Sequence, residues 1–240
     1  MATENPEDVL FAPAGPARSR PAGEVRAVVF DWGGVLTPPI PALIRAWATA
    51  DQVDWESYLA AVGPWLTAAY ESGGERNPVH ALERGECTVA EFEALLAQRL
   101  VRVDGGPVRA AGMLARMLPA GQPVTVMYDL IRDVRARGLR TALLSNSWGD
   151  AGYPRADFPA LFDSVVISHE VGMRKPEPGI FLHTAASLGL PPSQCAFIDD
   201  IGFNIAAAEA LGMTGIHHTD PAATAARLSE LLSSGGRPQY

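Results

Sequence analysis

Four short stretches of the sequence carry side chains that could react with a substrate or bind a ligand. They are Asp31, the pair Ser145-Asn146, Lys175 and the pair Asp199-Asp200. A carboxylate can act as a nucleophile or a metal ligand, hydroxyl and amide groups donate hydrogen bonds, and an ammonium offsets negative charge. Two adjacent carboxylates repel each other unless a cation neutralises them. One site built from all four stretches would have the parts needed for phosphoryl transfer.

Each stretch also has a purely structural interpretation. An aspartate often ends a strand, Ser-Asn often caps a helix, and Asp199-Asp200 could cap the helix that follows it. Lys175 is the only lysine among 19 Lys and Arg residues. Because arginine replaces lysine everywhere else, this one position is expected to need a compact ammonium, unless a single lysine simply fell there by chance. The joint occurrence of the four stretches favours the catalytic interpretation.

The elements around these residues predict an α/β fold with a doubly wound, mostly parallel sheet. Residues 25–31 are an apolar, β-branched run that ends at Asp31 and leads into Gly33-Gly34, which is typical of a buried strand followed by a tight turn. Ligands bind such sheets at the carboxyl ends of the strands, where glycine lets backbone amides approach an anion. Further strands are expected at 139–144, 164–168, 195–198 and 214–217, and helices at 124–137, 179–188, 204–211 and 221–232.

A helical insertion is expected to interrupt the sheet after its first strand. Apolar residues recur at helical spacing from about residue 43 to residue 118, and Thr88 with Glu91 forms a capping-box pattern. Pro38, Pro39 and Pro41 are expected to prevent regular structure at the start of the insertion. The predicted organisation is a disordered tail (1–24), an α/β core (25–37 and 123–232), a helical cap (38–122) and a second tail (233–240).

Composition limits the classes of partner. The 240 residues carry a formal net charge of -8, which argues against nucleic acid or an anionic membrane as the main partner. Cys87 and Cys195 lie far apart, and a buried free thiol at Cys195 is expected rather than a disulfide. No membrane span and no signal peptide are expected, so the interpretation is a cytoplasmic protein whose oligomeric state is open.

The four stretches resemble the four signatures of the haloacid dehalogenase superfamily, and the likeness extends from about Val25 to His217. More narrowly, the segments that follow are similar to the phosphatase domain at the N-terminus of soluble epoxide hydrolases. They are 143–148 (LLSNSW), 171–178 (VGMRKPEP), 197–204 (FIDDIGFN) and, in the expected cap, 82–88 (LERGECT). Matched strings of this length are far more specific than an isolated glycine pattern.

The resemblance implies a Mg²⁺-dependent phosphatase that hydrolyses a small phosphorylated metabolite through an aspartyl-phosphate on Asp31. Lys175 would be catalytic with Asp31, because it offsets the charge that Asp31 shares with the phosphate. The implied phosphate-binding residues are Trp32, Gly33, Ser145, Asn146 and Lys175. The implied Mg²⁺ ligands are Asp31, Gly33, Asp199 and Asp200, with Asn204 orienting the acidic pair or a metal-bound water.

One position departs from the family pattern. Phosphatases of this superfamily usually carry a general-acid Asp two residues after the nucleophile, and here that residue is Gly33. General acid–base assistance contributes about 10²- to 10⁴-fold in rate, so a metal-bound water or a cap carboxylate is hypothesised to supply the proton. Alternatives are a non-catalytic phospho-ligand-binding protein and a metal-independent dehalogenase. Arg76 and Arg84 either contact an anionic substrate or are solvated.

Overall fold

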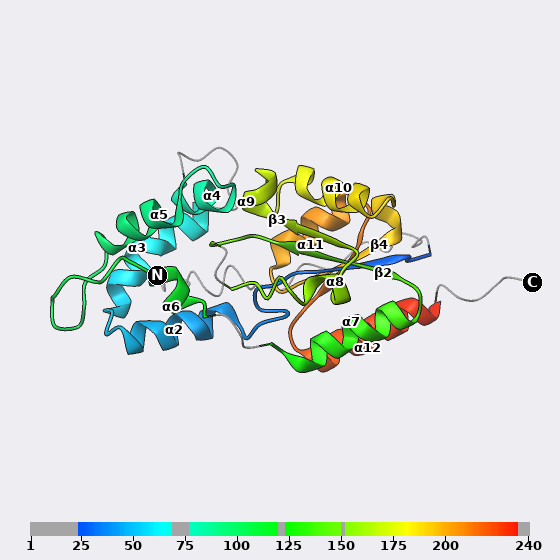
Figure 1. The fold of residues 1–240 in the computed structure, drawn as a ribbon, viewed down its shortest axis with the longest axis horizontal. Helices are drawn as coiled ribbons and strands as arrows, with labels where there is room; N and C mark the ends of the chain where they lie inside the picture. Colours follow the sequence, from blue (N-terminus) through cyan, green and yellow to red (C-terminus); the bar gives the residue numbers. More distant parts are fainter. Residues whose placement is uncertain (1–23, 69–76, 120–122, 150–151, 235–240) are drawn as a thin grey trace, which may run out of the picture.

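A five-stranded parallel sheet lies at the centre of the molecule in the computed structural model, which describes residues 24–68, 77–119, 123–149 and 152–234 (Figure 1). The strand order is β3-β2-β1-β4-β5, and every neighbouring pair is parallel. The strands are β1 (Ala27–Phe30), β2 (Arg140–Ser145), β3 (Ser164–Ile167), β4 (Cys195–Asp199) and β5 (Thr214–His217). The predicted α/β class and all five predicted strands are confirmed, with ends that shift by no more than two residues.

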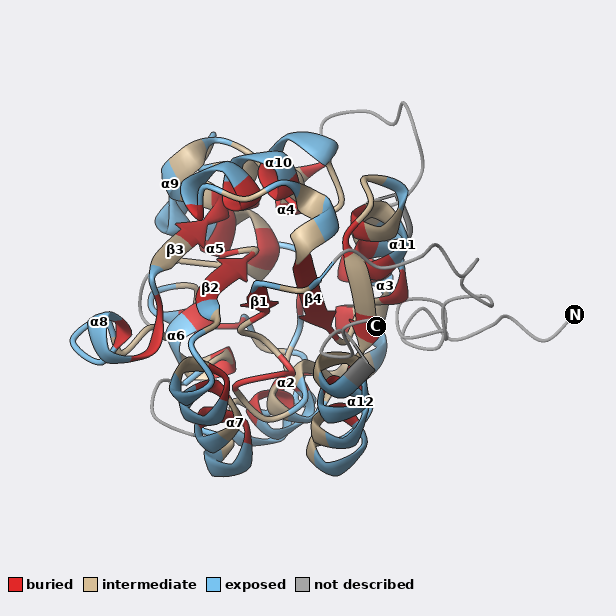
Figure 2. Ribbon diagram, turned by 90° about the vertical axis from the view of Figure 1, so that its right-hand side faces the viewer, coloured by how far each residue is buried: buried red, intermediate tan, exposed pale blue. Residues whose placement is uncertain are grey.

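Helices cover both faces of the sheet, as Figure 2 shows by burial. Val28 and Phe30 of β1 point to one face, where they join the side chains of α7 (Thr125–Ala136), α8 (Phe158–Leu161) and α12 (Pro221–Ser234). The alternate residues Ala27 and Val29 point to the other face and join α10 (Pro178–Ser187) and α11 (Gly202–Ala210). A strand buried on both faces has no polar face, which explains why β1 is a continuous apolar run.

Among the described residues, five helices lie between β1 and α7 in the sequence and occupy one end of the sheet (Figure 1). They are α2 (Ile40–Ala50), α3 (Trp55–Ala68), α4 (Pro78–Glu83), α5 (Val89–Ala97) and α6 (Met113–Met117), and we call them the insert helices. Their apolar faces form a separate buried cluster that includes Trp47, Phe92, Leu96 and Met113. The periodic apolar residues of this segment are therefore core residues of the insert, as their spacing predicts.

Two details of the insert differ from expectation. Helix α2 begins at Ile40, so Pro41 stands in its first turn, where a helix has no intrahelical partner for the backbone N–H and proline is tolerated. The chain between α5 and α6 is not helical throughout, because Val101 forms an isolated bridge with Pro107 and Arg102 forms one with Val53.

The predicted capping box is confirmed. The Thr88 hydroxyl accepts from the Glu91 amide at 3.2 Å, while the Thr88 amide donates to the Glu91 carboxylate at 2.8 Å. This reciprocal pair satisfies the first amides of α5.

The chain ends fall largely outside the described residues. Of the predicted tails, 1–23 and 235–240 lie there, and α12 continues through Ser234. Short elements complete the core: α9 (Ser168–Val171) and a 3-10 turn (Pro192–Gln194). Cys195 is buried, Cys87 is partly exposed, and both thiols are free, as expected. None of the helices in the described ranges combines the length and apolar character that a bilayer span requires.

Candidate active site

The carboxyl ends of β1, β2 and β4 bring the predicted site residues to one edge of the sheet. Asp31 directly follows β1, and its backbone amide donates to the Ile198 carbonyl of β4 at 2.9 Å. Ser145 ends β2, and Asp199 ends β4. Parallel neighbours in register deliver their last residues to the same edge, so residues more than a hundred positions apart become neighbours.

Lys175 lies between two carboxylates at this edge. Its Nζ is 2.6 Å from Asp31 Oδ1 and 2.7 Å from Asp199 Oδ2, and it also faces the Phe197 ring. The lysine is 2% exposed, Asp31 5% and Asp199 0%, so this ion triplet is almost completely desolvated. Burial lowers the pKa of Lys175, but the two carboxylates outweigh burial and raise it above its ordinary value. The ammonium is therefore charged throughout the physiological pH range.

Three carboxylates cluster around the single ammonium of Lys175. Oxygens of Asp31, Asp199 and Asp200 all lie within 4.8 Å of one another. Burial raises the pKa of Asp31 to about 7, with Lys175 lowering it and Asp199 raising it. Burial and the neighbouring carboxylates also raise the pKa of Asp200 well above its usual range. This excess of negative charge is the environment that a divalent cation would neutralise.

The adjacent aspartates Asp199 and Asp200 have different surroundings. Both oxygens of Asp199 accept from the Asn204 amide, one also accepts from the Ile201 backbone amide, and the other from Lys175. These four hydrogen bonds fill the acceptor sites of a carboxylate. In contrast, Asp200 Oδ1 is buried without a hydrogen-bond partner, and so is Asn204 Oδ1. Buried oxygens without partners are rare, and these two lie where a cation or water would satisfy them.

Gly34 allows the turn after β1 to approach Asp200 closely. Its φ is +79°, and a Cβ at this position would lie 2.1 Å from Asp200 Oδ2. Any side chain here would clash with the carboxylate as well as strain the backbone. Gly33 is different, because it lacks a positive φ and its Cβ would meet only the tip of the Ile40 side chain, at 3.2 Å.

The predicted phosphate-binding pair Ser145-Asn146 is placed at the site, but its side chains have protein partners. Asn146 Nδ2 donates to the Lys175 carbonyl at 3.0 Å, and the Lys175 amide donates to Asn146 Oδ1 at 2.8 Å. The Asn146 side chain thus holds the backbone of Lys175 and has one amide hydrogen left. Ser145 Oγ lies 2.8 Å from the Tyr153 hydroxyl.

Sequence reasoning missed Tyr153. Its ring packs against Trp32, with centroids 5.4 Å apart, and its hydroxyl reaches Ser145 Oγ. Burial raises the pKa of Tyr153 to about 12, so the phenol keeps its proton at neutral pH. A lone tyrosine in a loop carries no motif, and only its position beside β2 identifies it.

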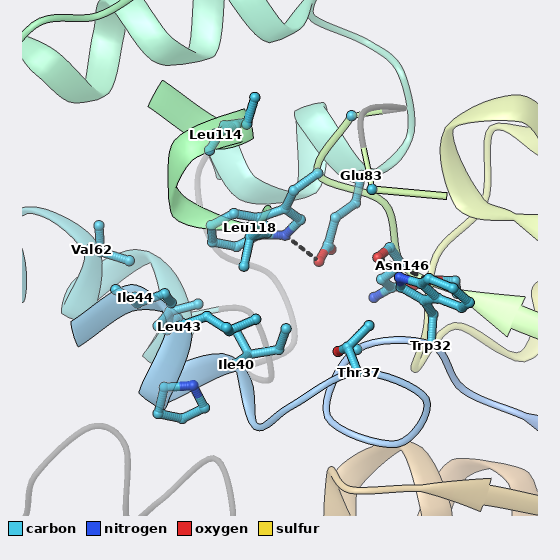
Figure 3. A pocket seen from close by; sticks show the side chains of 18 of the residues that line it. Trp32, Thr37, Ile40, Leu43, Ile44, Val62, Glu83, Leu114, Leu118 and Asn146 are labelled. Carbon is cyan, nitrogen blue, oxygen red and sulfur yellow. Dashed lines mark hydrogen bonds between the residues drawn. The ribbon is translucent and has the colours of Figure 1, made fainter. Parts of the chain in front are cut away.

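A cavity of about 560 Å³ opens above these polar groups. Its polar floor consists of Asp31, Ser145, Lys175 and Asp200, together with Asn146 and Asn204. Its apolar wall comes from α2, α3, α6 and the residue that follows α6: Ile40, Leu43, Ile44, Leu59, Val62, Leu66, Leu114 and Leu118. Figure 3 shows Leu43, Ile44 and Val62 across the space from Trp32 and Asn146, with Glu83 above Asn146 in this view.

A polar contact that the motifs did not predict joins the insert helices to the core. Glu83 at the end of α4 is 6% exposed and accepts from the Arg174 guanidinium and, at 3.2 Å, from the Trp148 indole. The neighbouring Arg84 pairs with Glu177 of the core. Arg84 is therefore engaged at the surface between insert and core, and Arg76 lies outside the described residues.

Comparison with known proteins identifies the family. A model of haloacid dehalogenase-like hydrolases matches residues 25–212. A solved structure of a haloacid dehalogenase family enzyme from Bacteroides thetaiotaomicron, in complex with magnesium and inorganic phosphate, superposes with a TM-score of 0.57 at 23% identity. It covers 80% of this chain and 93% of that one, and it shows the shared fold.

Three relatives of known name are similar over most of the chain. Mouse acyl-CoA dehydrogenase family member 10 is 32% identical across 86% of this chain and 19% of its own length. Bifunctional epoxide hydrolase 2 of Sus scrofa is 27% identical across 80% of this chain and 36% of its own length. Sesquiterpene phosphatase astK of Aspergillus oryzae is 30% identical across 86% of this chain and 96% of its own length.

The chain thus spans about a fifth of the first relative and just over a third of the second. The match to the epoxide hydrolase confirms the narrower resemblance predicted from the motif strings. With the family model over residues 25–212 and a phosphatase aligned over nearly its whole length, the chain belongs to the haloacid dehalogenase-like hydrolases.

Proposed function

We propose that this hydrolase is a Mg²⁺-dependent phosphatase that cleaves a small phosphorylated organic metabolite through an aspartyl-phosphate on Asp31. The observation that carries the proposal is the buried Lys175 ammonium, 2.6 Å from Asp31, beside an Asp200 oxygen without a partner. A dehalogenase needs no cation, whereas the excess of carboxylate charge in this cluster is what a divalent cation would neutralise. The phosphatase name of a relative aligned over nearly its full length supports the same activity.

The donor set suits a hard divalent cation. Asp31 and Asp200 would hold Mg²⁺ together with the Gly33 carbonyl, since all-oxygen ligands are the ones that Mg²⁺ prefers. Asp199 was also predicted as a ligand, but its four hydrogen bonds lead us to assign it the positioning of Lys175 and Asn204. When bound, the cation would neutralise carboxylate charge and polarise a phosphoryl oxygen. The magnesium–phosphate complex of the structural neighbour is consistent with this assignment.

In the proposed reaction, a carboxylate oxygen of Asp31 attacks phosphorus, the P–O bond to the alcohol breaks, and an aspartyl-phosphate forms. Water then attacks the phosphorus, which releases inorganic phosphate and regenerates the carboxylate. Lys175 holds Asp31 in position and offsets the charge of the phosphoryl oxygens. Ser145 Oγ, the remaining amide hydrogen of Asn146 and the backbone amides after Asp31 are the groups that would donate to those oxygens.

The residues that line the cavity limit which groups could donate the proton to the leaving group. Glu83 and Glu93 are the insert carboxylates that line the cavity among the described residues. Glu83 accepts from Arg174 and Trp148, and Glu93 accepts from the amides of Gly112 and Leu114, both at 2.9 Å. Both carboxylates are thus already engaged by donors within the protein. We therefore assign the proton to water in the cavity, which Asn204 Oδ1 can orient.

Residues 38–122 are proposed to act as the cap over this site. Their own buried cluster and the cavity between them and the sheet edge support that division. A lid of this kind excludes bulk water from the reacting phosphate.

The test is phosphate release from a panel of phosphomonoesters with Mg²⁺, with and without a chelator. Asp31→Asn is expected to lower turnover by at least about a thousandfold, while the exposed carboxylate variant Asp129→Asn leaves it unchanged. Gly33→Asp fits with a small shift of Ile40 and is expected to raise the rate, because it restores a general acid.

Other outcomes select the alternatives. Halide release that resists the chelator would identify a dehalogenase. Phosphate-analogue binding with no turnover in either the native protein or Gly33→Asp would identify a phospho-ligand-binding protein.

A further inference from the structure

A tyrosine lies at the edge of the site, and the proposed reaction gives it no role. Tyr153 comes eight positions after Ser145, the last residue of β2, and its hydroxyl lies 2.8 Å from Ser145 Oγ. Both residues line the cavity, and Asp31 is near enough to act electrostatically on the phenol. Because Ser145 is one of the groups that would donate to the phosphoryl oxygens, its contact with Tyr153 bears on the reaction.

The ring of Tyr153 is held in place by its neighbours. It packs against Trp32, with centroids 5.4 Å apart, and edge-on against Phe158, with centroids 6.2 Å apart. Those two rings also contact each other, at 5.9 Å. The Arg155 guanidinium lies 5.8 Å from the centroid of the Tyr153 ring. A ring enclosed in this way keeps its hydroxyl at a fixed place beside Ser145.

The direction of the hydrogen bond between the two hydroxyls follows from the number of hydrogens that they have. Each hydroxyl has one hydrogen to donate, and each oxygen can also accept. If Ser145 donates its hydrogen to Tyr153, none is left for a phosphoryl oxygen. Ser145 can therefore serve the substrate only when Tyr153 is the donor. Burial raises the pKa of Tyr153 to about 12, so the phenol has its hydrogen at neutral pH.

Other partners of the two hydroxyls are already engaged or distant. Ser147, the other serine near the phenol, donates to the Gly149 carbonyl at 2.9 Å and accepts from the Gly149 amide at 3.1 Å. The only other acceptor that the described residues offer Ser145 Oγ is the Asn146 carbonyl, at 3.4 Å. This distance exceeds the usual range of an O–H···O bond. The Ser145 hydrogen can thus turn toward the cavity when Tyr153 donates.

We propose that Tyr153 is a positioning residue of the site, which donates to Ser145 Oγ and thereby directs the Ser145 hydrogen to a phosphoryl oxygen of the substrate. The inference rests on the proposed phosphatase function and adds a residue to it. Tyr153 acts through Ser145 and makes no contact of its own with the phosphate. Two hydrogen bonds in series strengthen each other, so Ser145 becomes a better donor as well as an oriented one.

The first experiment removes the donor and keeps the ring. For Tyr153→Phe with Mg²⁺ and a phosphomonoester that the native protein hydrolyses, we expect kcat to fall about tenfold and KM to change by less than about threefold. The reason is that a preoriented donor stabilises the transition state more than the bound substrate. Tyr128→Phe is the matched control, because Tyr128 is a buried tyrosine on α7 that does not line the cavity.

The control is expected to leave kcat and KM unchanged, and melting temperatures show that both variants are folded. An unchanged kcat in Tyr153→Phe would overturn the inference and leave the phosphatase proposal intact. A tenfold rise in KM with kcat unchanged would also overturn it, because Tyr153 would then contribute only to substrate binding.

A double-mutant cycle tests whether Tyr153 acts through Ser145. Ser145→Ala removes the oriented donor itself and is expected to lower kcat about a hundredfold. In that background Tyr153→Phe should have no further effect, because the hydroxyl that Tyr153 orients is gone. A double variant with kcat equal to that of Ser145→Ala would support the inference. A further loss of about tenfold in the double variant would overturn it.

Binding of orthovanadate separates this inference from the phosphatase proposal. If the native protein hydrolyses no phosphomonoester, the phosphatase proposal fails, and calorimetry with orthovanadate and Mg²⁺ still tests Tyr153. Vanadate resembles the transition state of phosphoryl transfer, so Tyr153→Phe should weaken its binding about tenfold, and not at all in the Ser145→Ala background. Equal vanadate affinities of the native and Tyr153→Phe proteins, or no binding to the native protein, would overturn the inference.

Discussion

The polar floor and the apolar wall of the cavity are held together by different interactions. On the floor, the buried Lys175 ammonium lies 2.6 Å from Asp31 and 2.7 Å from Asp199, so each of these buried charges depends on its partners. The wall consists of aliphatic side chains on and beside the insert helices, and most of them are buried or partly buried members of the insert's own apolar cluster. The floor therefore tolerates little change, whereas the wall can be remodelled at low cost as long as its volume is conserved.

The polar floor and the apolar wall therefore need different structural support. Charges can be held this close only by a rigid frame, and the register of β1 with β2 and β4 provides it. Apolar contacts are non-directional, so short helices on irregular connections can supply them. We infer that the sheet edge carries the chemistry and the insert helices carry the preference for the substrate.

The largest effect on stability is expected when the floor loses its cation. Lys175→Met leaves Asp31 and Asp199 buried without their shared partner, and it should lower the free energy of unfolding by about 3–5 kcal/mol at pH 8. Urea denaturation measures this change. Arg132→Met, which removes an exposed pair with Asp129, is the control and should change stability by less than about 1 kcal/mol. A Lys175→Met protein as stable as the control would contradict our account of the floor.

The contact between the two regions should give the next largest effect. Glu83→Gln leaves the guanidinium of Arg174, which is 3% exposed, without its carboxylate, and it should cost about 2 kcal/mol or more in urea denaturation. Glu86→Gln changes an exposed carboxylate on the same segment and is the matched control. If the two variants are equally stable, Glu83 does not fasten the insert to the core.

The stabilisation of the protein by Mg²⁺ should depend on Asp200. In the metal-free protein, Asp200→Asn removes one of three clustered negative charges and should raise the melting temperature by a few degrees. Saturating Mg²⁺ should raise the melting temperature of the native protein, because it binds only the folded state, but it should have little effect on the variant. An equal Mg²⁺ shift in native and Asp200→Asn proteins would exclude Asp200 as a ligand.

The smallest effect is expected at the start of α5 in the insert. The Thr88 backbone amide and hydroxyl lower the pKa of Glu91 below its ordinary value of 4.5. The ionised carboxylate therefore stabilises the folded state above about pH 4.5, and this contribution disappears as the pH falls through the lowered pKa. Glu91→Gln should reduce the difference in unfolding free energy between pH 6 and pH 3. If native and variant proteins lose stability in parallel, the capping box contributes nothing through this titration.

Much of the fold follows from local pattern. Each strand is a short, largely apolar run that ends at or directly before a polar residue, and each flanking helix has regular apolar spacing, so class and strand positions could be predicted. The start of α2 could not be predicted, because a proline such as Pro41 ends a helix at interior positions and is tolerated only in the first turn, where the structure has it.

The residue types and their order along the chain identify the groups that could do chemistry: Asp31 after a buried strand, the single lysine, and an acidic pair, in motif strings specific to one family. The contacts that give each of these groups its surroundings appear only in the folded structure. It pairs Asp199 with Lys175 and leaves Asp200 Oδ1 without a hydrogen-bond partner, makes Asn146 the support of the Lys175 backbone, and joins Glu83 to Arg174 across 91 positions of the chain. Hydrogen bonds and ion pairs depend on distances of a few ångströms between remote segments, and no local pattern of residues encodes those distances.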